Sequence, residues 1–359
     1  MIKQTSLMPI KIKNLNIKTK IFFAPINTGY CVSGTPNEKF IEFYKTISGN
    51  NIGITYVGNV AIGKEYTTNN RTAYFNNNEA IWREVVKVIN KSGGIAGVQL
   101  GCRYSSIIPE INMSISSAAK EEYLCRAKRE INDMSIKEIE TIIKMYIHCA
   151  IKAYKIGFKV IQIHAAHGYF LSLILSGKFN ERKDIYGIDR LKVVRDIVSG
   201  IYEKIPGAIL DIRLSLLEGI GSEKQELMYK KEIIDEIQKM KISMVSLSNG
   251  IYNMDKTMIY PSKSISYNKM LKYGQYFAEK YPDIVWNIAG NMEKVIFDEK
   301  DKLNNLTYSI GRQLLVDPKT FYKYENNIFE VIKCKDCNRC HYYSISDRCL
   351  NWCINLERN

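Results

Sequence analysis

The stretch that decides the fold is residues 159–164, which read KVIQIH. In an extended chain, successive side chains point to opposite faces, so Ile161 and Ile163 share one face while Gln162 and His164 share the other. An apolar outer face is typical of a parallel strand that helices cover, and the polar face then points inward. We therefore predict a strand of an α/β protein that carries His164 at its carboxyl end.

Seven more short runs rich in β-branched residues recur along the chain at wide intervals, with helical patterns between them. Strands that alternate with helices predict a parallel sheet, and eight such units predict a closed (β/α)8 TIM barrel. The predicted strands are residues 21–24, 52–57, 95–100, 160–164, 209–214, 244–247, 285–289 and 306–310.

The clearest helical pattern covers residues 135–156. Ser135 followed three residues later by Glu138 predicts a capping box at the helix start. Apolar residues then recur at helical spacing, and Gly157 is a typical residue just past a helix end. Further helices are predicted at residues 79–90, 191–204, 224–240 and 269–280.

Three segments depart from a minimal barrel. Residues 1–20 resemble a hairpin that could plug the barrel floor, and residues 101–134 form a long insertion after the third strand. Residues 333–359 form a cysteine-rich tail. We therefore predict two units, a barrel over residues 1–333 and a tail over residues 334–359.

Charge and hydropathy limit the classes of function. The formal net charge is +14, but the lysines are spread along the chain and no recognition motif accompanies them, so nucleic-acid binding is not expected. A basic surface could instead attract an acidic redox partner. The sequence contains no apolar run of about 18 residues, the length that predicts a membrane helix. Its first residues lack an apolar stretch long enough for a signal peptide. We expect a cytoplasmic protein that does not bind membranes.

Polar residues gather where the predicted strands end. By the same alternation, Gln99 in the third strand and Arg213 in the fifth point inward, as His164 does in the fourth. Active sites of barrels lie at the carboxyl ends of their strands. An inward arginine needs an anionic or electron-rich partner, because an unpaired buried charge is costly. A structural ion pair would explain one such residue, but three together favour a binding site.

The last two predicted strands both end in glycine, at Gly290 and Gly311. Loops after the seventh and eighth strands are the usual phosphate site of barrels, and glycine lets backbone N–H groups approach a phosphate closely. Arg312 adds a guanidinium that can bind phosphate through two hydrogen bonds. The pair of glycines therefore predicts a phosphorylated cofactor such as FMN.

Residues 164–171, which read HAAHGYFL, resemble the signature of the old yellow enzyme, or NADH:flavin oxidoreductase, family. The match continues through Asn180-Glu181-Arg182, Asp184 and Tyr186-Gly187, and the resemblance covers roughly residues 8–333. It implies that FMN is bound by Pro25, Ile26, Asn27, Gly58, Asn59, Gln99, His164, Arg213, Gly290, Gly311 and Arg312.

The resemblance also implies three catalytic residues. His164 and His167 would hold the carbonyl oxygen of an electron-poor substrate, and Tyr169 would donate a proton to the α-carbon after hydride transfer from the flavin. A phenol with a pKa of about 10 is protonated at pH 7 and can act as an acid. A metal pair or core packing is the alternative for the two histidines. The segment from Gln99 to Arg103 is shorter than in the family. The resemblance therefore does not predict which residues form the substrate side of the pocket.

Five of the nine cysteines lie in the tail. The spacing Cys334-x2-Cys337-x2-Cys340-x12-Cys353 resembles the 4Fe-4S motif of larger relatives, including dienoyl-CoA reductases and trimethylamine dehydrogenase. Cys349 is an alternative fourth ligand, and a zinc site is an alternative to the cluster.

Those larger relatives continue into a nucleotide-binding half, and no dinucleotide-binding fingerprint follows the cysteines here. The expected electron donor is therefore a separate ferredoxin or flavoprotein, with NAD(P)H acting directly on FMN as the alternative. The resemblance also implies a homo-oligomer such as a dimer. The favoured reaction is reduction of an activated C=C bond. An amine-type dehydrogenase and a zinc-stabilised, non-enzymatic binding module are the alternatives.

Overall fold

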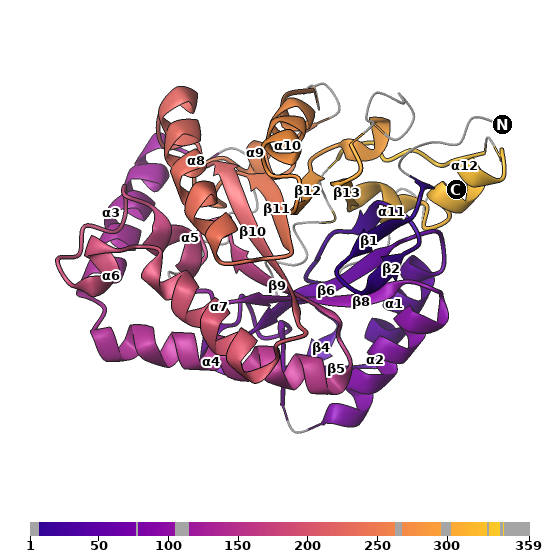
Figure 1. Cartoon of the computed structure of the whole chain (residues 1–359), viewed down its shortest axis with the longest axis horizontal. Coiled ribbons are helices and arrows are strands. Elements are labelled where there is room, and N and C mark those ends of the chain that lie inside the picture. The colour runs from indigo at the N-terminus through magenta and orange to yellow at the C-terminus, as the bar shows by residue number, and fades with distance from the viewer. Residues whose placement is uncertain are drawn as a thin grey trace.

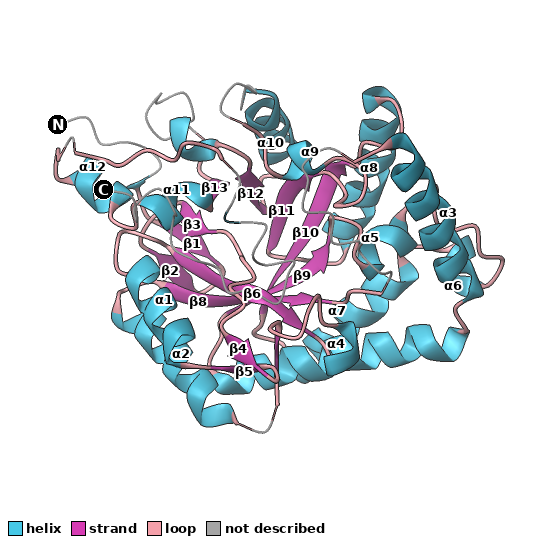
Figure 2. Ribbon diagram, turned by 180° about the vertical axis from the view of Figure 1, so that it is seen from behind, coloured by secondary structure: helices cyan, strands magenta, loops and turns pink. Residues whose placement is uncertain are grey.

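The computed structural model describes residues 7–76, 78–104, 115–262, 268–295, 303–328, 330–337 and 340. Eight parallel strands close into a barrel, because the first of them, β3, pairs with both β13 and β6. Figures 1 and 2 show helices arranged around these strands. The barrel strands are β3 (Ile21–Phe23), β6 (Ile54–Ala61), β8 (Ile95–Gly101), β9 (Val160–Ala165), β10 (Ile209–Leu217), β11 (Met244–Asn249), β12 (Val285–Ala289) and β13 (Leu306–Ile310).

All eight strands were predicted from the sequence, and the fold class is confirmed. The alternation in β9 is as expected: Ile161 and Ile163 pack in the large core between strands and helices. Val160 packs in a second, smaller core inside the barrel. The differences are at strand ends, where β6 and β10 run four and three residues further than predicted, toward the cavity described below.

An N-terminal hairpin covers the barrel floor, as the sequence predicted. Strands β1 (Ile10–Ile12) and β2 (Leu15–Ile17) pair antiparallel. Ile10, Ile12 and Ile17 belong to the same apolar cluster as Val160 and the first residues of other barrel strands. Burial of this apolar surface fills the amino-terminal end of the barrel.

Helix α4 (Ile136–Ile156) is the clearest agreement between sequence and structure. The Ser135 hydroxyl accepts a hydrogen bond from the Glu138 amide at 3.2 Å, and the Glu138 carboxylate accepts one from the Ser135 amide at 2.8 Å. Gly157 ends the helix at a φ of +123°, which a residue with a side chain rarely adopts. The predicted insertion is partly helical, because α3 (Ser117–Asp133) occupies its second half.

The remaining elements cover the barrel or connect its strands. In the parts of the chain that the structure describes, no helix combines the length and the apolarity that crossing a membrane requires. These elements are β4 (Cys31–Val32), β5 (Thr35–Pro36), β7 (Ala73–Tyr74), α1 (Glu38–Ser48), α2 (Glu79–Lys91), α5 (Phe170–Leu175), α6 (Ile185–Ile188), α7 (Lys192–Lys204), α8 (Glu223–Lys239), α9 (Lys256–Ile259), α10 (Asn268–Lys280), α11 (Arg312–Val316), α12 (Thr320–Glu325), and the 3-10 turns η2 (Lys64–Tyr66) and η3 (Met292–Lys294).

Candidate active site

A single cavity opens at the carboxyl ends of the barrel strands and collects nearly all residues that the sequence proposed. Gly58 is the exception in the barrel: it does not line the cavity, and a side chain at this position would meet Gln99. The predicted residues that line the cavity are Pro25, Ile26, Asn27, Asn59, Gln99, His164, His167, Tyr169, Arg213, Gly290, Gly311 and Arg312.

A hydrogen-bonded layer inside the barrel fixes the floor of this cavity. The buried carboxylate of Asp211 accepts hydrogen bonds from Tyr56 Oη and Gln162 Nε2 at 2.6 Å each and from Ser246 Oγ at 2.7 Å. Gln162 Oε1 in turn accepts a bond from Gln99 Nε2 at 2.6 Å. The bond to Asp211 sets the orientation of the Gln162 amide, and Gln162 in turn sets that of the Gln99 amide. The Gln99 side-chain oxygen is then free to accept a hydrogen bond from a ligand in the cavity.

His164, His167 and Tyr169 form one cluster. The ring centroids of His164 and His167 lie 5.1 Å apart, and those of His164 and Tyr169 lie 4.6 Å apart. His167 Nε2 is 2.8 Å from Ser248 Oγ, and the His167 amide donates to Ser215 Oγ at 3.0 Å. These bonds hold His167 at a φ of +63°, a conformation that costs backbone energy.

Burial sets the protonation states of this cluster. Desolvation, aided by the charge of Arg213, holds the pKa of both His164 and His167 well below 6.5. Both imidazoles are therefore neutral at pH 7 and can donate an N–H to a substrate oxygen. Burial also raises the pKa of Tyr169 above 10, so its phenol keeps its proton. The cluster can therefore polarise an oxygen and deliver a proton.

The structure adds residues that the sequence did not single out. Tyr252 and Tyr260 line the cavity with their hydroxyls 2.7 Å apart, and the Tyr252 ring lies 6.4 Å from that of Tyr169. Thr68 Oγ1 is 3.1 Å from Tyr169 Oη. The rule that found His164 would have found the tyrosines, because they follow β11 at the same end of the barrel.

The other end of the cavity is suited to phosphate. Gly290 adopts a φ of +108°, which requires glycine, and it is followed by Asn291. Arg312 Nη2 donates to Asn291 Oδ1 at 2.7 Å and to the Pro261 carbonyl at 2.5 Å. Its Nη1 also forms an ion pair with Asp336 at 3.5 Å. Arg312 is thus held at the cavity wall beside both glycine turns.

Buried polar atoms in the cavity have no partner among the described residues. They are Asn59 Nδ2, His164 Nδ1 and Arg213 Nε. Each such group costs on the order of 1–3 kcal/mol when it is left without a hydrogen bond. A planar polar ring could form hydrogen bonds with these atoms, and a phosphate could lie against the backbone of Gly290 and the guanidinium of Arg312 at the other end. The residues present therefore fit FMN.

The cysteine tail meets the barrel beside Arg312. Gln313 Oε1 accepts a hydrogen bond from the Cys334 amide at 3.1 Å, and Cys334 itself lines the cavity. Cys337 is exposed, and Cys340 packs against the core. Within the described ranges, no group of three histidine, cysteine or acidic side chains is placed to hold a metal. Cys349 and Cys353 lie outside those ranges.

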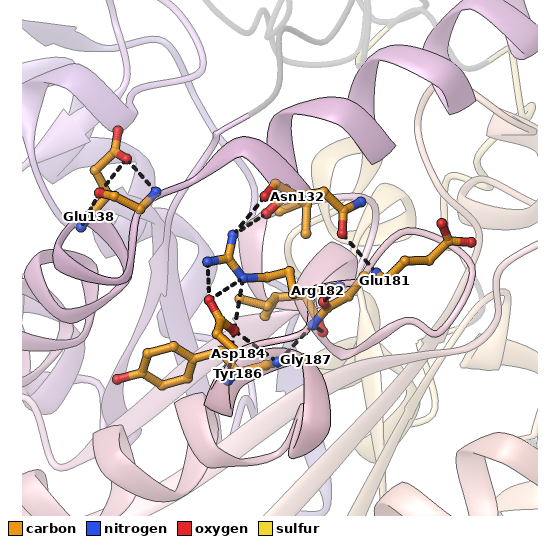
Figure 3. Close-up of polar contacts among 11 residues, drawn as sticks. Asn132, Glu138, Glu181, Arg182, Asp184, Tyr186 and Gly187 are labelled. Atoms are coloured by element: carbon orange, nitrogen blue, oxygen red, sulfur yellow. Dashed lines mark hydrogen bonds and ion pairs between the residues drawn. The ribbon is translucent and has the colours of Figure 1, made fainter.

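The second half of the sequence signature has a structural role (Figure 3). Arg182 donates to the carbonyls of Ile131 and Asn132 at the end of α3, at 2.8 and 3.2 Å, and pairs with Asp184. The Asp184 carboxylate also caps the first turn of α6. These contacts tie α3 to the segment after α5, and they explain charged residues that do not reach the cavity.

The closed barrel and the His164–His167–Tyr169 cluster at its mouth are what a flavin-dependent oxidoreductase of the barrel class requires. The sequence model of the NADH:flavin oxidoreductase / NADH oxidase family matches residues 7–330, and the chain belongs to this family.

Individual proteins of known name or structure are also similar to this chain. An NADH oxidase of Thermoanaerobacter brockii is 25% identical over 351 residues, which cover 91% of this chain and 52% of that protein. The chain thus spans about half the length of this relative. Old yellow enzyme from Pichia sp. AKU4542 superposes with a TM-score of 0.73 at 17% identity, covering 93% of this chain and 89% of that one. A 2-naphthoyl-CoA reductase gives 0.80 at 16% identity, covering 97% and 56%. The two structures share the fold.

Proposed function

We propose that the protein reduces an activated C=C bond, of the enone, enoate or enoyl type, with FMN as its cofactor. The observation that carries this proposal is the cluster of two neutral histidines beside a protonated tyrosine, over a cavity that fits FMN. When bound, FMN supplies the hydride that reaches the β-carbon of the substrate.

The residues of the chain would do the rest. Imidazole N–H groups of His164 and His167 would donate to the substrate oxygen, where negative charge develops. Tyr169 would give its proton to the α-carbon. Gln99 and Arg213 would hold the polar edge of the flavin ring, Pro25, Ile26, Asn27 and Asn59 would line the ring, and Gly290, Gly311 and Arg312 would bind the phosphate.

The charge of the cavity favours this reaction over oxidation of an amine. Arg103 lines the cavity beside Tyr169, and Arg213 bonds to Ser248 next to His167. The two carboxylates in the lining belong to Asp336, which pairs with Arg312, and to Glu293, which lies just after Gly290. A protonated amine would meet like charge beside the histidines, whereas an electron-rich oxygen would be attracted.

Replacement of Tyr169 by phenylalanine tests the proposal. We expect Tyr169→Phe to slow reoxidation of the reduced flavin by an enone by roughly 10²–10⁴-fold, because the proton source is lost. Flavin reduction should be nearly unchanged. Stopped-flow absorbance measures the two half-reactions separately, with NADH, NADPH and reduced ferredoxin compared as electron donors.

Tyr252→Phe is the matched control, because it removes a hydroxyl that bonds to Tyr260 instead. It should slow reoxidation far less than Tyr169→Phe. Unchanged turnover in Tyr169→Phe would remove Tyr169 from the mechanism. Reduction by neither nicotinamide would favour a separate ferredoxin or flavoprotein as the donor.

We also propose that Cys334, Cys337, Cys340 and Cys353 bind a 4Fe-4S cluster. Support comes from their spacing and from the position of Cys334 at the cavity wall, near the proposed flavin. Anaerobically purified protein should contain about four irons and four labile sulfides per chain. If the protein contains zinc and no iron, the cysteines form a structural zinc site instead of a cluster, and the proposal of a one-electron partner loses its basis.

A further inference from the structure

Arg103 is a cation in the cavity that the proposed chemistry does not use. It follows β8, is half-buried, and lines the cavity together with Thr68 and Tyr169. Its Nη1 donates to the Thr68 carbonyl at 2.7 Å and to the Thr67 carbonyl at 3.4 Å. Its backbone amide donates to the Tyr66 carbonyl at 3.2 Å. The side chain is therefore held by backbone carbonyls of the loop after β6.

The charge of Arg103 has no acidic partner in the described parts of the chain. No carboxylate there forms an ion pair with it, and neither Nε nor Nη2 has a protein partner among those residues. These two nitrogens share one edge of the guanidinium, with the spacing of the two oxygens of one carboxylate. A half-buried arginine with this edge open is suited to binding a carboxylate of a ligand.

The position of Arg103 tells which end of a ligand it would meet. Tyr169 Oη is 3.1 Å from Thr68 Oγ1, and the Thr68 carbonyl accepts from Arg103. The His164 ring centroid lies 4.6 Å from that of Tyr169, and the two ring planes are tilted by 47°. The charge of Arg103 also acts on Tyr169, where it lowers the pKa against the larger effect of burial. Tyr169 thus contacts His164 directly and is linked to Arg103 through Thr68.

We infer that Arg103 is a specificity-determining residue, which binds a carboxylate at the end of the substrate remote from the oxygen held by His164 and His167. This inference rests on the proposed reduction of an activated C=C bond, and it narrows the substrates to those that carry such an anionic group. The shortened connection after Gln99 places Arg103 here, because only Leu100, Gly101 and Cys102 separate them.

Two probes that differ at one end, where one carries a carboxylate and the other an uncharged ester, test the inference: 4-carboxycinnamaldehyde and its methyl ester. Both carry the same aldehyde-activated double bond. Each is titrated anaerobically into the oxidised FMN holoenzyme, and flavin absorbance gives the dissociation constant. We expect the wild-type protein to bind the carboxylate at least about tenfold more tightly than the ester, which corresponds to about 1.4 kcal/mol.

Arg103→Gln should lose this preference. Its affinity for the carboxylate should fall at least about tenfold, while its affinity for the ester should be nearly unchanged. Arg103→Lys should retain part of it, because it keeps the charge but not the two-nitrogen edge. Arg129→Gln is the matched control, because Arg129 is exposed on α3. It should bind both probes like the wild type.

The outcomes separate the two proposals. Equal wild-type affinity for acid and ester, or equal weakening of both by Arg103→Gln, would overturn the role of Arg103. Single-turnover reoxidation of the reduced enzyme tests the reaction itself, and failure to reduce either probe would count against C=C reduction. If Arg103→Gln does not retain flavin, the preference for acid over ester in the wild-type protein and in Arg103→Lys still tests the role of Arg103.

Discussion

At the scale of single residues, the site depends on side chains kept uncharged by burial. His164 and His167 are nearly inaccessible to solvent, and their pKa values lie well below 6.5. The same property links the site to stability, because a histidine that resists protonation in the folded protein takes up a proton readily when unfolded.

We therefore predict that the free energy of unfolding decreases as the pH falls below about 6.5. The folded pKa of each histidine is below its unfolded value, so the unfolded state binds more protons in this range and is favoured. The loss should reach up to about 1.4 kcal/mol per pH unit for each buried histidine. Urea denaturation at pH 7.5 and pH 5.5 measures it.

His167→Asn should reduce this dependence on pH, whereas His148→Asn should not, because His148 is exposed on α4. An equal dependence in His167→Asn and the wild type would show that other groups control acid destabilisation.

At the scale of elements, the turn from β13 into α11 joins the phosphate end of the cavity to the tail. Arg312 pairs with Asp336, and the side chains are 11% and 10% exposed. The next residue, Gln313, accepts from the Cys334 amide and donates to the Ile332 carbonyl at 2.9 Å. The carboxylate of Asp336 and a flavin phosphate would therefore compete for the same guanidinium.

Asp336→Asn should tighten FMN binding to the apoprotein by roughly three- to tenfold, because the competing negative charge is removed. Quenching of flavin fluorescence on titration measures the affinity. Glu330→Gln, at an exposed acid of the same segment, should leave it unchanged. Weaker binding in Asp336→Asn would mean that Asp336 positions Arg312 for the phosphate instead of competing with it.

At the scale of the whole molecule, the barrel separates stability from chemistry. The hairpin and the first residues of the strands form the apolar cluster at the floor. The layer around Asp211 lies above it and links six side chains through hydrogen bonds between strands. The strand ends beyond this layer are then left to bind ligands, and loops can vary there without cost to the core.

The sequence alone determined the barrel and most of its cavity. Strand alternation is a local rule with a period of two, so the inward positions of Gln99, His164 and Arg213 follow from their neighbours in sequence. The capping of α4 by Ser135 and Glu138 is equally local, and the structure confirms it. The glycine ends of β12 and β13 were predictable because barrels close in a fixed order.

Only the tertiary structure decided which residues from separate strands and loops meet. Arg103 reaches Thr68 across 35 residues, Gln99 is oriented through Gln162 by Asp211, and Arg312 meets Asp336. No local pattern predicts these contacts, because they depend on how strands register and loops fold back over the barrel mouth. Gln99, His164 and Arg213 lie on strands and could be predicted, whereas Arg103 and Thr68 lie in loops whose meeting no local pattern predicts.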